Sequence, residues 1–219
     1  MEYFALSDSN GIPLDKKLDE LFGHKTDGFY IELGAFDGIT QSNTYFFEKY
    51  RNWKGVLIEP SKDAFKLCSE NRPNSIVIND CCVSNAYSQP YITGDFNSIL
   101  MASVNGTRLI EQRQPVQTMV TVSASTLESI LDDIHPQTID LLSLDTEGYE
   151  LDVLKGLNLD KYRPQYMLIE IYARDFKEIS EFLASKNYRL HSNFSNYNRN
   201  DCPLWDGSHN DYLFESIVR

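Results

Sequence analysis

The sequence predicts a doubly wound α/β fold, and three observations support this prediction. Stretches that fit strands alternate along the chain with stretches that fit helices. The strand candidates in the middle, such as Gly55–Glu59 and Ile139–Leu144, are mainly apolar runs, which is typical of parallel strands buried on both faces. The length of 219 residues suits one α/β domain with a sizeable core. We therefore expect a single domain over residues 1–219, with helices on both faces of a parallel sheet.

The first elements follow from apolar spacing and capping residues. Leu14, Leu18 and Leu21 recur at helical spacing, so we expect a helix over Pro13–Leu21 within an N-terminal helical cap, residues 1–26. Ser61 is a good N-cap for the second of the helices that follow. The predicted strands and helices then alternate as Phe29–Leu33, Ser42–Tyr50, Gly55–Glu59, Ser61–Asn71 and Ser75–Asn79.

Residues 84–123 interrupt this alternation with a glycine- and proline-containing stretch that ends in an alternating piece, Gln117–Val122. Ser125-Thr-Leu-Glu128 fits a capping box, which predicts a helix through Ile130. The remaining predicted elements are strand Ile139–Leu144, helix Gly148–Lys155, strand Tyr166–Ile171, helix Asp175–Lys186, and strands Arg189–Ser192 and Tyr212–Val218.

Charge and cysteine content narrow the classes of partner. The net charge of −12 disfavours a nucleic-acid backbone or an anionic membrane as the main partner. The four cysteines form no C-x-x-C pair, so we expect reduced thiols. No apolar run approaches the roughly 20 residues that span a bilayer. A cytoplasmic location is the expectation.

The stretch Phe29–Thr40, FYIELGAFDGIT, reads as a strand followed by a glycine-containing turn that carries two carboxylates, Glu32 and Asp37. The spacing of Gly34 and Gly38 is G-x-x-x-G, which is neither the G-x-G-x-x-G of dinucleotide sites nor a P-loop. Carboxylates suit a ligand with a cationic end, such as the ammonium group of S-adenosylmethionine. A plain strand–turn–helix with solvated acids fits this loop equally well.

Two further acidic positions follow the next predicted strands. Glu59 ends the second strand, where a carboxylate can accept two hydrogen bonds from a ribose diol. Asp80 and Cys81 follow the third strand, where a carboxylate and a backbone N–H could meet the edge of an adenine. Each acid alone is more often a cap or a solvated loop residue, but three at successive strand ends favour a nucleoside-containing ligand.

Several segments together resemble the FkbM family of S-adenosylmethionine-dependent methyltransferases, and the resemblance covers roughly residues 27–172. The most specific segment is Asp145-Thr-Glu-Gly-Tyr-Glu150, a D-x-E-G-x-E pattern after the fourth strand. The other matching segments are IELGAFDGITQSNTYFFE, GVLIEPSKDAFKLC, IDLLSLDTEGYELDVLKGL and YMLIEI.

The resemblance implies a Rossmann-like class I methyltransferase fold, whose seven-stranded sheet is mostly parallel with one antiparallel strand near the C-terminus. It also implies methylation of hydroxyl groups. The cofactor positions it carries over are Glu32, Gly34, Asp37, Gly38, Ser42 and Asn43 for the methionine end, Glu59 for the ribose, Asp80 and Cys81 for the adenine, and Asp145 beside the methyl group. Many members have lysine where this chain has Ser143, so any charge from that lysine is absent here.

Methyl transfer to a hydroxyl needs a group that takes up the hydroxyl proton. Asp145, Glu147 and Glu170 are the candidates at the ends of neighbouring strands, and His191 is a fourth, with His209 a further histidine to consider. One carboxylate could act as the base, or two or three could hold Mg²⁺ or Mn²⁺; no metal ligand is assigned. Glu147 could instead simply cap the helix that begins near Gly148.

Residues 84–116 and 191–210 are the predicted acceptor-side loops. Tyr197 and Trp205 could stack on a sugar, and Arg108 and Arg113 could grip an anionic group. We therefore expect O-methylation of a sugar hydroxyl, in glycan biosynthesis, by a chain that could be one module of a larger glycan-processing polypeptide. A non-sugar small metabolite as acceptor, and a non-catalytic cofactor-binding module, remain the alternatives.

Overall fold

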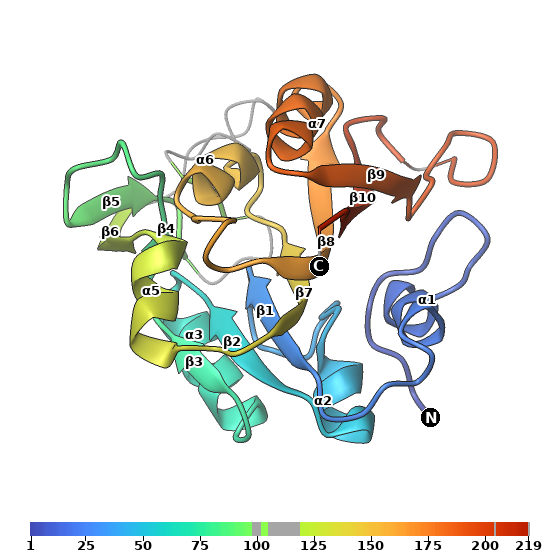
Figure 1. Cartoon of the computed structure of the whole chain (residues 1–219), viewed down its shortest axis with the longest axis horizontal. Coiled ribbons are helices and arrows are strands. Elements are labelled where there is room, and N and C mark those ends of the chain that lie inside the picture. The colour runs from blue at the N-terminus through green and yellow to red at the C-terminus, as the bar shows by residue number, and fades with distance from the viewer. Residues whose placement is uncertain (98–101, 105–118, 204, 219) are drawn as a thin grey trace.

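The computed structural model describes residues 1–97, 102–104, 119–203 and 205–218. A seven-stranded sheet forms its centre, with the strand order β3-β2-β1-β7-β8-β10-β9 (Figure 1). The first five strands in this order are parallel to one another. The strand β10 runs antiparallel to both β8 and β9. The strands are β1 (Phe29–Leu33), β2 (Lys54–Ile58), β3 (Ile76–Ile78), β7 (Ile139–Leu144), β8 (Pro164–Tyr172), β9 (Tyr188–Asn193) and β10 (His209–Ser216). The predicted mostly parallel sheet is confirmed.

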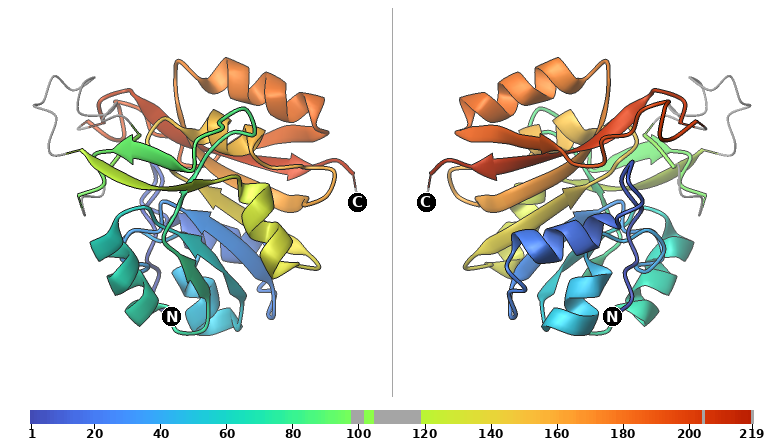
Figure 2. Two further views of the ribbon diagram at one scale, coloured as in Figure 1. Left: turned by 90° about the vertical axis from the view of Figure 1, so that its left-hand side faces the viewer. Right: turned by 90° about the vertical axis from the view of Figure 1, so that its right-hand side faces the viewer.

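Helices cover both faces of this sheet (Figure 2). Buried residues of α1 (Leu14–Leu21), α2 (Tyr45–Arg51) and α3 (Lys62–Asn71) belong to one hydrophobic cluster, which includes Leu14, Phe46 and Cys68. Those of α5 (Leu127–Ile134), α6 (Glu150–Lys155) and α7 (Phe176–Ser185) belong to a second. Alternate side chains of the central strands point into opposite clusters: Tyr30 lies in the first and Ile31 in the second. Both faces of the sheet are therefore buried, as the apolar strands predict.

The interrupted stretch contributes a small second sheet that the sequence did not predict. It has the order β4-β6-β5, with β4 (Cys81–Cys82), β5 (Tyr91–Gly94) and β6 (Val120–Ser125). Only part of the predicted alternating piece Gln117–Val122 is described, and it forms the start of β6. The predicted capping box is wrong by one residue, because Ser125 pairs with Cys82 as the last residue of β6 and Thr126 is the N-cap of α5.

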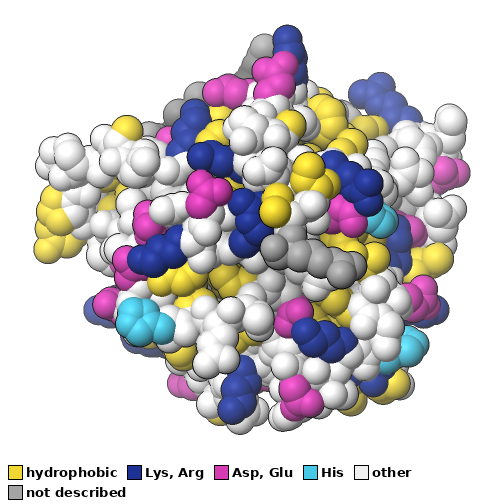
Figure 3. Space-filling model, in the orientation of Figure 1, with side chains coloured by type: hydrophobic (Ala, Val, Ile, Leu, Met, Phe, Trp, Pro, Cys, Tyr) yellow, Lys and Arg dark blue, Asp and Glu magenta, His cyan; other side chains and the backbone are white. Residues whose placement is uncertain are grey.

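The surface and the termini complete the description. The N-terminal segment and α1 lie together at one side of the sheet (Figure 1). On the face in Figure 3, the described basic and acidic side chains are interspersed. Within the described ranges, no helix has the length and apolar character needed to cross a membrane. All four cysteines are free thiols.

Candidate active site

A cavity of about 250 Å³ opens at the carboxyl ends of the parallel strands. It lies where the strand order reverses between β1 and β7, the position at which open α/β sheets bind ligands. The predicted residues that line it are Glu32, Gly34, Ser42, Asn43, Glu59, Asp80, Cys81, Asp145, Glu147 and Glu170. The structure therefore brings together ten of the predicted site residues, which lie near the carboxyl ends of five neighbouring strands or in the segments that follow them.

The loop after β1 is held in a strained conformation. Phe36 and Gln41 have positive φ angles of 46° and 60°, which are unfavourable for residues with a side chain. Gly34 has φ +77°, and a Cβ atom there would lie 1.9 Å from the backbone oxygen of Asp145. Glycine is required at this position because the loops after β1 and β7 touch through their backbones.

Glu32 organises the next part of the same loop. Its buried carboxylate accepts hydrogen bonds from the Ser42 hydroxyl at 2.9 and 3.0 Å, from the Asn43 backbone N–H at 3.0 Å and from the Thr44 hydroxyl at 2.6 Å. The side-chain oxygen of Asn43 is buried and has no hydrogen-bond partner among the described residues. That oxygen is an open acceptor at the end of the cavity assigned to the methionine part of a cofactor.

Asp37 and Gly38 do not line the cavity, so direct cofactor contact is not supported for either residue. The Asp37 carboxylate turns back to accept from the backbone N–H groups of Ile39 and Thr40, at 2.9 and 2.7 Å. Partial burial would raise the pKa of Asp37, but these bonds and that of the Thr40 hydroxyl lower it overall. A Cβ atom on Gly38 would lie 2.7 Å from Cγ of Arg72, so this glycine admits α3 against the loop.

Glu59 is buried at the end of β2 and faces the cavity. One carboxylate oxygen accepts from the Phe36 N–H at 2.8 Å and the other from the Ser61 N–H at 2.7 Å. Burial raises the pKa of Glu59 to about 7, against the lowering effect of these two bonds. Each oxygen retains acceptor capacity, as hydrogen bonds from a ribose diol would require.

Asp80 and Cys81 line the cavity in the segment that follows β3, and they are hydrogen-bonded to each other. Asp80 accepts from the Cys81 backbone N–H at 2.8 Å and from the Ser125 hydroxyl at 2.6 Å. The Cys81 N–H is therefore already engaged, and the prediction that it donates to an adenine ring is not supported. Burial raises the pKa of the Cys81 thiol to about 12, so the thiol is neutral. Phe96 and Val104 add buried apolar surface here; sequence reasoning missed both, since they lie outside any periodic segment.

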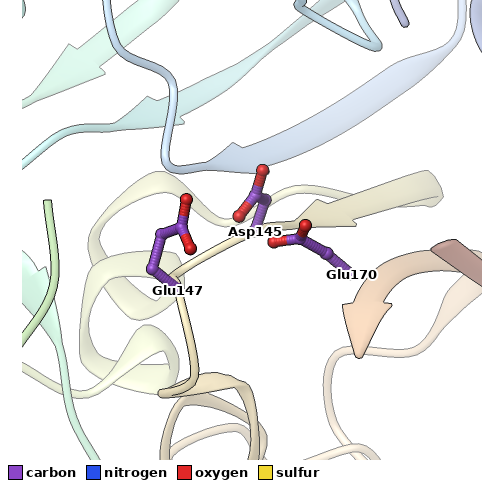
Figure 4. A group of neighbouring side chains, drawn as sticks. All are labelled: Asp145, Glu147 and Glu170. Atoms are coloured by element: carbon purple, nitrogen blue, oxygen red, sulfur yellow. The ribbon is translucent and has the colours of Figure 1, made fainter. Parts of the chain in front are cut away.

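Three carboxylates converge at the cavity from two neighbouring strands (Figure 4). Asp145 and Glu147 follow β7, Glu170 lies near the end of β8, and one oxygen from each lies within 4.8 Å of the others. Asp145 is exposed to the cavity, but the protein that surrounds the cavity desolvates its carboxyl group and raises its pKa, with a further contribution from the Glu147 charge. Desolvation also raises the pKa of Glu170, with the Asp145 charge second. The pair can therefore share a proton near neutral pH.

The D-x-E-G-x-E loop is shaped by its own last residue. Glu150 is buried and accepts from the backbone N–H groups of Thr146 and Gly148, at 2.9 and 3.0 Å. Glu147 and Gly148 have φ angles of +56° and +96°. The Tyr172 hydroxyl donates to Glu147 at 2.6 Å. The loop therefore directs Glu147 into the cavity, and the alternative in which Glu147 caps α6 is not observed.

The histidine prediction needs correction. His191 is exposed on the edge strand β9 and does not line the cavity. Its ring lies 6.3 Å from that of Tyr166, which pairs with Leu141 three residues before the end of β7, so His191 is too far from the carboxyl edge of the sheet. His209 lines the cavity instead, with Nε2 at 3.0 Å from Glu170. His209 begins β10, three residues before the predicted start of that strand, and pairs with Tyr172 at the end of β8.

The predicted acceptor-side loops are only partly described. Arg108 and Arg113 lie outside the described residues, as does most of 84–116 beyond residue 97. In the second loop, the Trp205 indole N–H donates to the His209 backbone oxygen at 2.9 Å, and the Tyr197 ring lies 6.3 Å from that of His209. Both aromatic residues therefore lie beside the histidine that contacts the carboxylates.

Comparison with known proteins identifies the family. The methyltransferase FkbM domain matches residues 32–190, which is well over half of the chain. No curated protein matches the sequence. The 23S rRNA methyltransferase ErmE is similar in structure, with a TM-score of 0.52 and 9% identity over 98% of this chain and 70% of that one.

Two further solved structures are similar. The METTL16 methyltransferase domain has a TM-score of 0.51 and 12% identity, over 93% of this chain and 66% of that one. TrmK of M. capricolum, solved with S-adenosylhomocysteine, has a TM-score of 0.48 and 10% identity, over 92% and 68%. At these identities the first two likenesses show a shared fold. With the sheet order, the cavity and the matched domain together, the chain belongs to the FkbM family of S-adenosylmethionine-dependent methyltransferases.

Proposed function

We propose that the chain transfers the methyl group of S-adenosylmethionine to a hydroxyl of a sugar in glycan biosynthesis. The observation that carries this proposal is the convergence of Asp145, Glu147 and Glu170 at one side of the cavity. A sugar hydroxyl is a poor nucleophile, and its proton must leave as the new bond to carbon forms. Carboxylates with raised pKa are stronger proton acceptors than ordinary ones, which suits an oxygen acceptor.

In this proposal the cofactor occupies the cavity along the carboxyl edge of the sheet. Glu59 accepts from the ribose hydroxyls, and Asp80 lies at the adenine end. Glu32, Ser42 and Asn43 form the end for the amino acid, where the unpartnered oxygen of Asn43 can accept from the ammonium group. The sulfonium leaves as a neutral thioether, so these residues act mainly by binding and orienting the donor.

The acid cluster supports two ways of handling the proton. In the first, one carboxylate of the Asp145–Glu170 pair takes the hydroxyl proton, and His209 orients Glu170 through a contact of 3.0 Å from its Nε2. In the second, the oxygens within 4.8 Å of one another hold a divalent cation that binds the acceptor hydroxyl. We favour the first, because Oε1 of Glu170 already has a nitrogen partner in His209, while its buried Oε2 has no hydrogen-bond partner among the described residues and is open to the hydroxyl proton.

A methyl-transfer assay over a panel of monosaccharides and glycans, read by mass spectrometry, tests the proposal. We expect a methylated sugar, and Glu170→Gln should lower turnover by roughly 10²–10⁴-fold while S-adenosylhomocysteine still binds. Glu178→Gln, at a side chain 71% exposed, is the matched control. Loss of activity in EDTA would select the metal route. Turnover only on a non-sugar metabolite would support the alternative in which the acceptor is a small metabolite. Absence of turnover on every acceptor would support the alternative of a non-catalytic cofactor-binding module.

RNA is the substrate named for the similar ErmE protein, and it enters the panel for that reason. The net charge of −12 argues against it here. We further propose a cytoplasmic location, which agrees with four free thiols, and a place as one module of a larger glycan-processing polypeptide.

A further inference from the structure

The first thirteen residues form a segment, here called the N-terminal strap, that lies outside the residues matched by the family domain. One end of the strap is attached to α2 and to the loop between β1 and α2, here called the cofactor loop (residues 34–44). Ala5 forms a parallel bridge with Gln41, and the Tyr3 ring stacks on Phe46 at 4.6 Å. The Phe4 N–H also donates to the buried carboxylate of Asp15 in α1, at 2.7 Å.

The other end of the strap is fastened to the acceptor side. The Ser9 N–H donates to the backbone oxygen of Ser195 at 2.9 Å. Asp8 forms an ion pair with Lys17 at 2.8 Å, and the Lys17 ammonium group also donates to the backbone oxygen of Phe194. The strap therefore joins the loop that follows β1, which lines the cavity, to the segment between β9 and β10.

Leu6 lies between these two attachments and lines the cavity. Its backbone oxygen accepts from the Leu14 N–H at 2.8 Å, which fixes its position on α1. Its side chain is 45% exposed, although the strap around it is well attached. The preceding residue, Ala5, bridges to Gln41, and both Gln41 and its neighbour Ser42 line the cavity.

We propose that Leu6 is a cofactor-contacting residue, which packs on the methionine end of S-adenosylmethionine and makes the strap part of the binding site. An exposed leucine beside an unfilled cavity loses its water when the aliphatic chain of the ligand covers it. Because opening the strap would also remove Leu6 from the bound ligand, cofactor binding and strap attachment stabilise each other. This inference depends on the assignment of Ser42 and Asn43 to the methionine end, not on the identity of the acceptor.

Calorimetry with S-adenosylhomocysteine tests the contact. Leu6→Ala should weaken affinity about three- to tenfold, since part of a leucine side chain no longer packs on the ligand. Leu6→Met should retain the wild-type affinity within about twofold. Ile12→Ala is the matched control, because Ile12 is a strap residue of similar exposure, 38%, that does not line the cavity; its affinity should not change. Wild-type affinity in Leu6→Ala would overturn the proposal.

Hydrogen exchange on the unchanged wild-type chain gives a second readout that needs no variant to fold. Saturating S-adenosylhomocysteine should slow exchange at the amide groups of the strap around Leu6, because opening the strap then breaks ligand contacts as well. Unchanged exchange in the strap, with slowed exchange around Glu59, would also overturn the proposal. Neither experiment involves methyl transfer, so failure to methylate any sugar leaves this test intact.

Discussion

Two glutamates of the D-x-E-G-x-E loop lie three residues apart and have different environments. Glu147 faces the cavity in a left-handed backbone conformation, while Glu150 is buried beneath the loop and accepts from its backbone N–H groups. A left-handed conformation at a residue with a side chain costs of order 1 kcal/mol, and the bonds to Glu150 offset that cost. The second glutamate therefore explains how the first can be held in place.

Glu59 should make cofactor affinity depend on pH. Its pKa of about 7 means that the carboxyl group is largely protonated at pH 5.5, and a protonated group cannot accept all of the hydrogen bonds from ribose and backbone. We expect S-adenosylhomocysteine affinity to fall as pH decreases below 7, by up to about tenfold per pH unit. Calorimetry at pH 5.5–8 measures this. Glu59→Ala should bind about 1.5–3 kcal/mol more weakly and lose most of the dependence; a parallel pH profile in the variant would contradict the assignment.

Glu59 should have the opposite pH effect on the stability of the cofactor-free chain: its contribution to the free energy of unfolding should fall as pH rises. The folded-state pKa of Glu59 is raised above its unfolded value of 4.5, so the folded state favours the protonated form. This contribution is fully present below about pH 4.5 and is lost as pH rises through about 7. Glutamine does not titrate, so only the wild type should lose this contribution. Between pH 5 and pH 8, the free energy of unfolding in urea should therefore fall by about 2 kcal/mol more for the wild type than for Glu59→Gln. A constant difference would argue against a raised pKa.

At the scale of elements, the hydroxyl groups of Ser125 and Thr126, at the start of α5, have different hydrogen-bond partners. Thr126 caps the helix through the Ser129 N–H at 3.1 Å, and Ser125 donates to Asp80. Thr126→Ala should lower the free energy of unfolding by about 1 kcal/mol without changing cofactor affinity. Ser125→Ala should weaken S-adenosylhomocysteine binding, because Asp80 is no longer held. Urea unfolding and calorimetry on both variants separate the two effects, and equal stability losses would refute the distinction.

Arg72, which follows α3, connects four elements around the cofactor loop. Its buried guanidinium group donates to Glu48 at 2.7 Å and to the Gly38 backbone oxygen at 2.8 Å, and lies 3.5 Å from Glu32. Arg72→Met would leave two buried carboxylates without their cation, at a cost of about 3–5 kcal/mol of unfolding free energy in a urea titration. Lys66→Met, on the exposed face of α3, should change it by less than about 0.5 kcal/mol. Near-equal effects of the two changes would show that the network contributes little.

For the whole molecule, the sequence predicted the sheet more completely than the site. The sequence predicted all seven strands of the large sheet, and the central ones were identified by continuous apolar runs, since burial on both faces leaves a strong pattern. The strands β4 and β5, which flank β6, were missed because two- and four-residue strands carry no detectable periodicity. His191 was preferred over His209 because sequence order does not reveal how far along an antiparallel strand a side chain lies. The raised pKa values of Asp145 and Glu170 follow from desolvation by the surrounding protein and from the neighbouring carboxylates, which spacing alone cannot show.

Charge is also a property of the whole molecule, and it gives a prediction about partners. With a net charge of −12, the chain should show no saturable binding to a labelled RNA hairpin at micromolar protein and about 0.15 M salt, measured by fluorescence anisotropy. A fluorescein-labelled sulfated oligosaccharide is a control for nonspecific polyanion binding. Tight binding to the hairpin that weakens steeply with salt would contradict the choice of a sugar over RNA.

The backbone contact between Gly34 and Asp145 has a consequence for changing the acceptor. Because main-chain atoms set the spacing between the donor pocket and the first acid, side-chain exchanges in residues 191–210 leave that spacing intact. A library that randomises only the exposed positions of this predicted acceptor-side segment, and keeps His209, is therefore expected to vary the acceptor while the spacing between the two loops is retained. Position 34 itself tolerates no diversity in such a library, since the smallest added carbon would force the two loops apart.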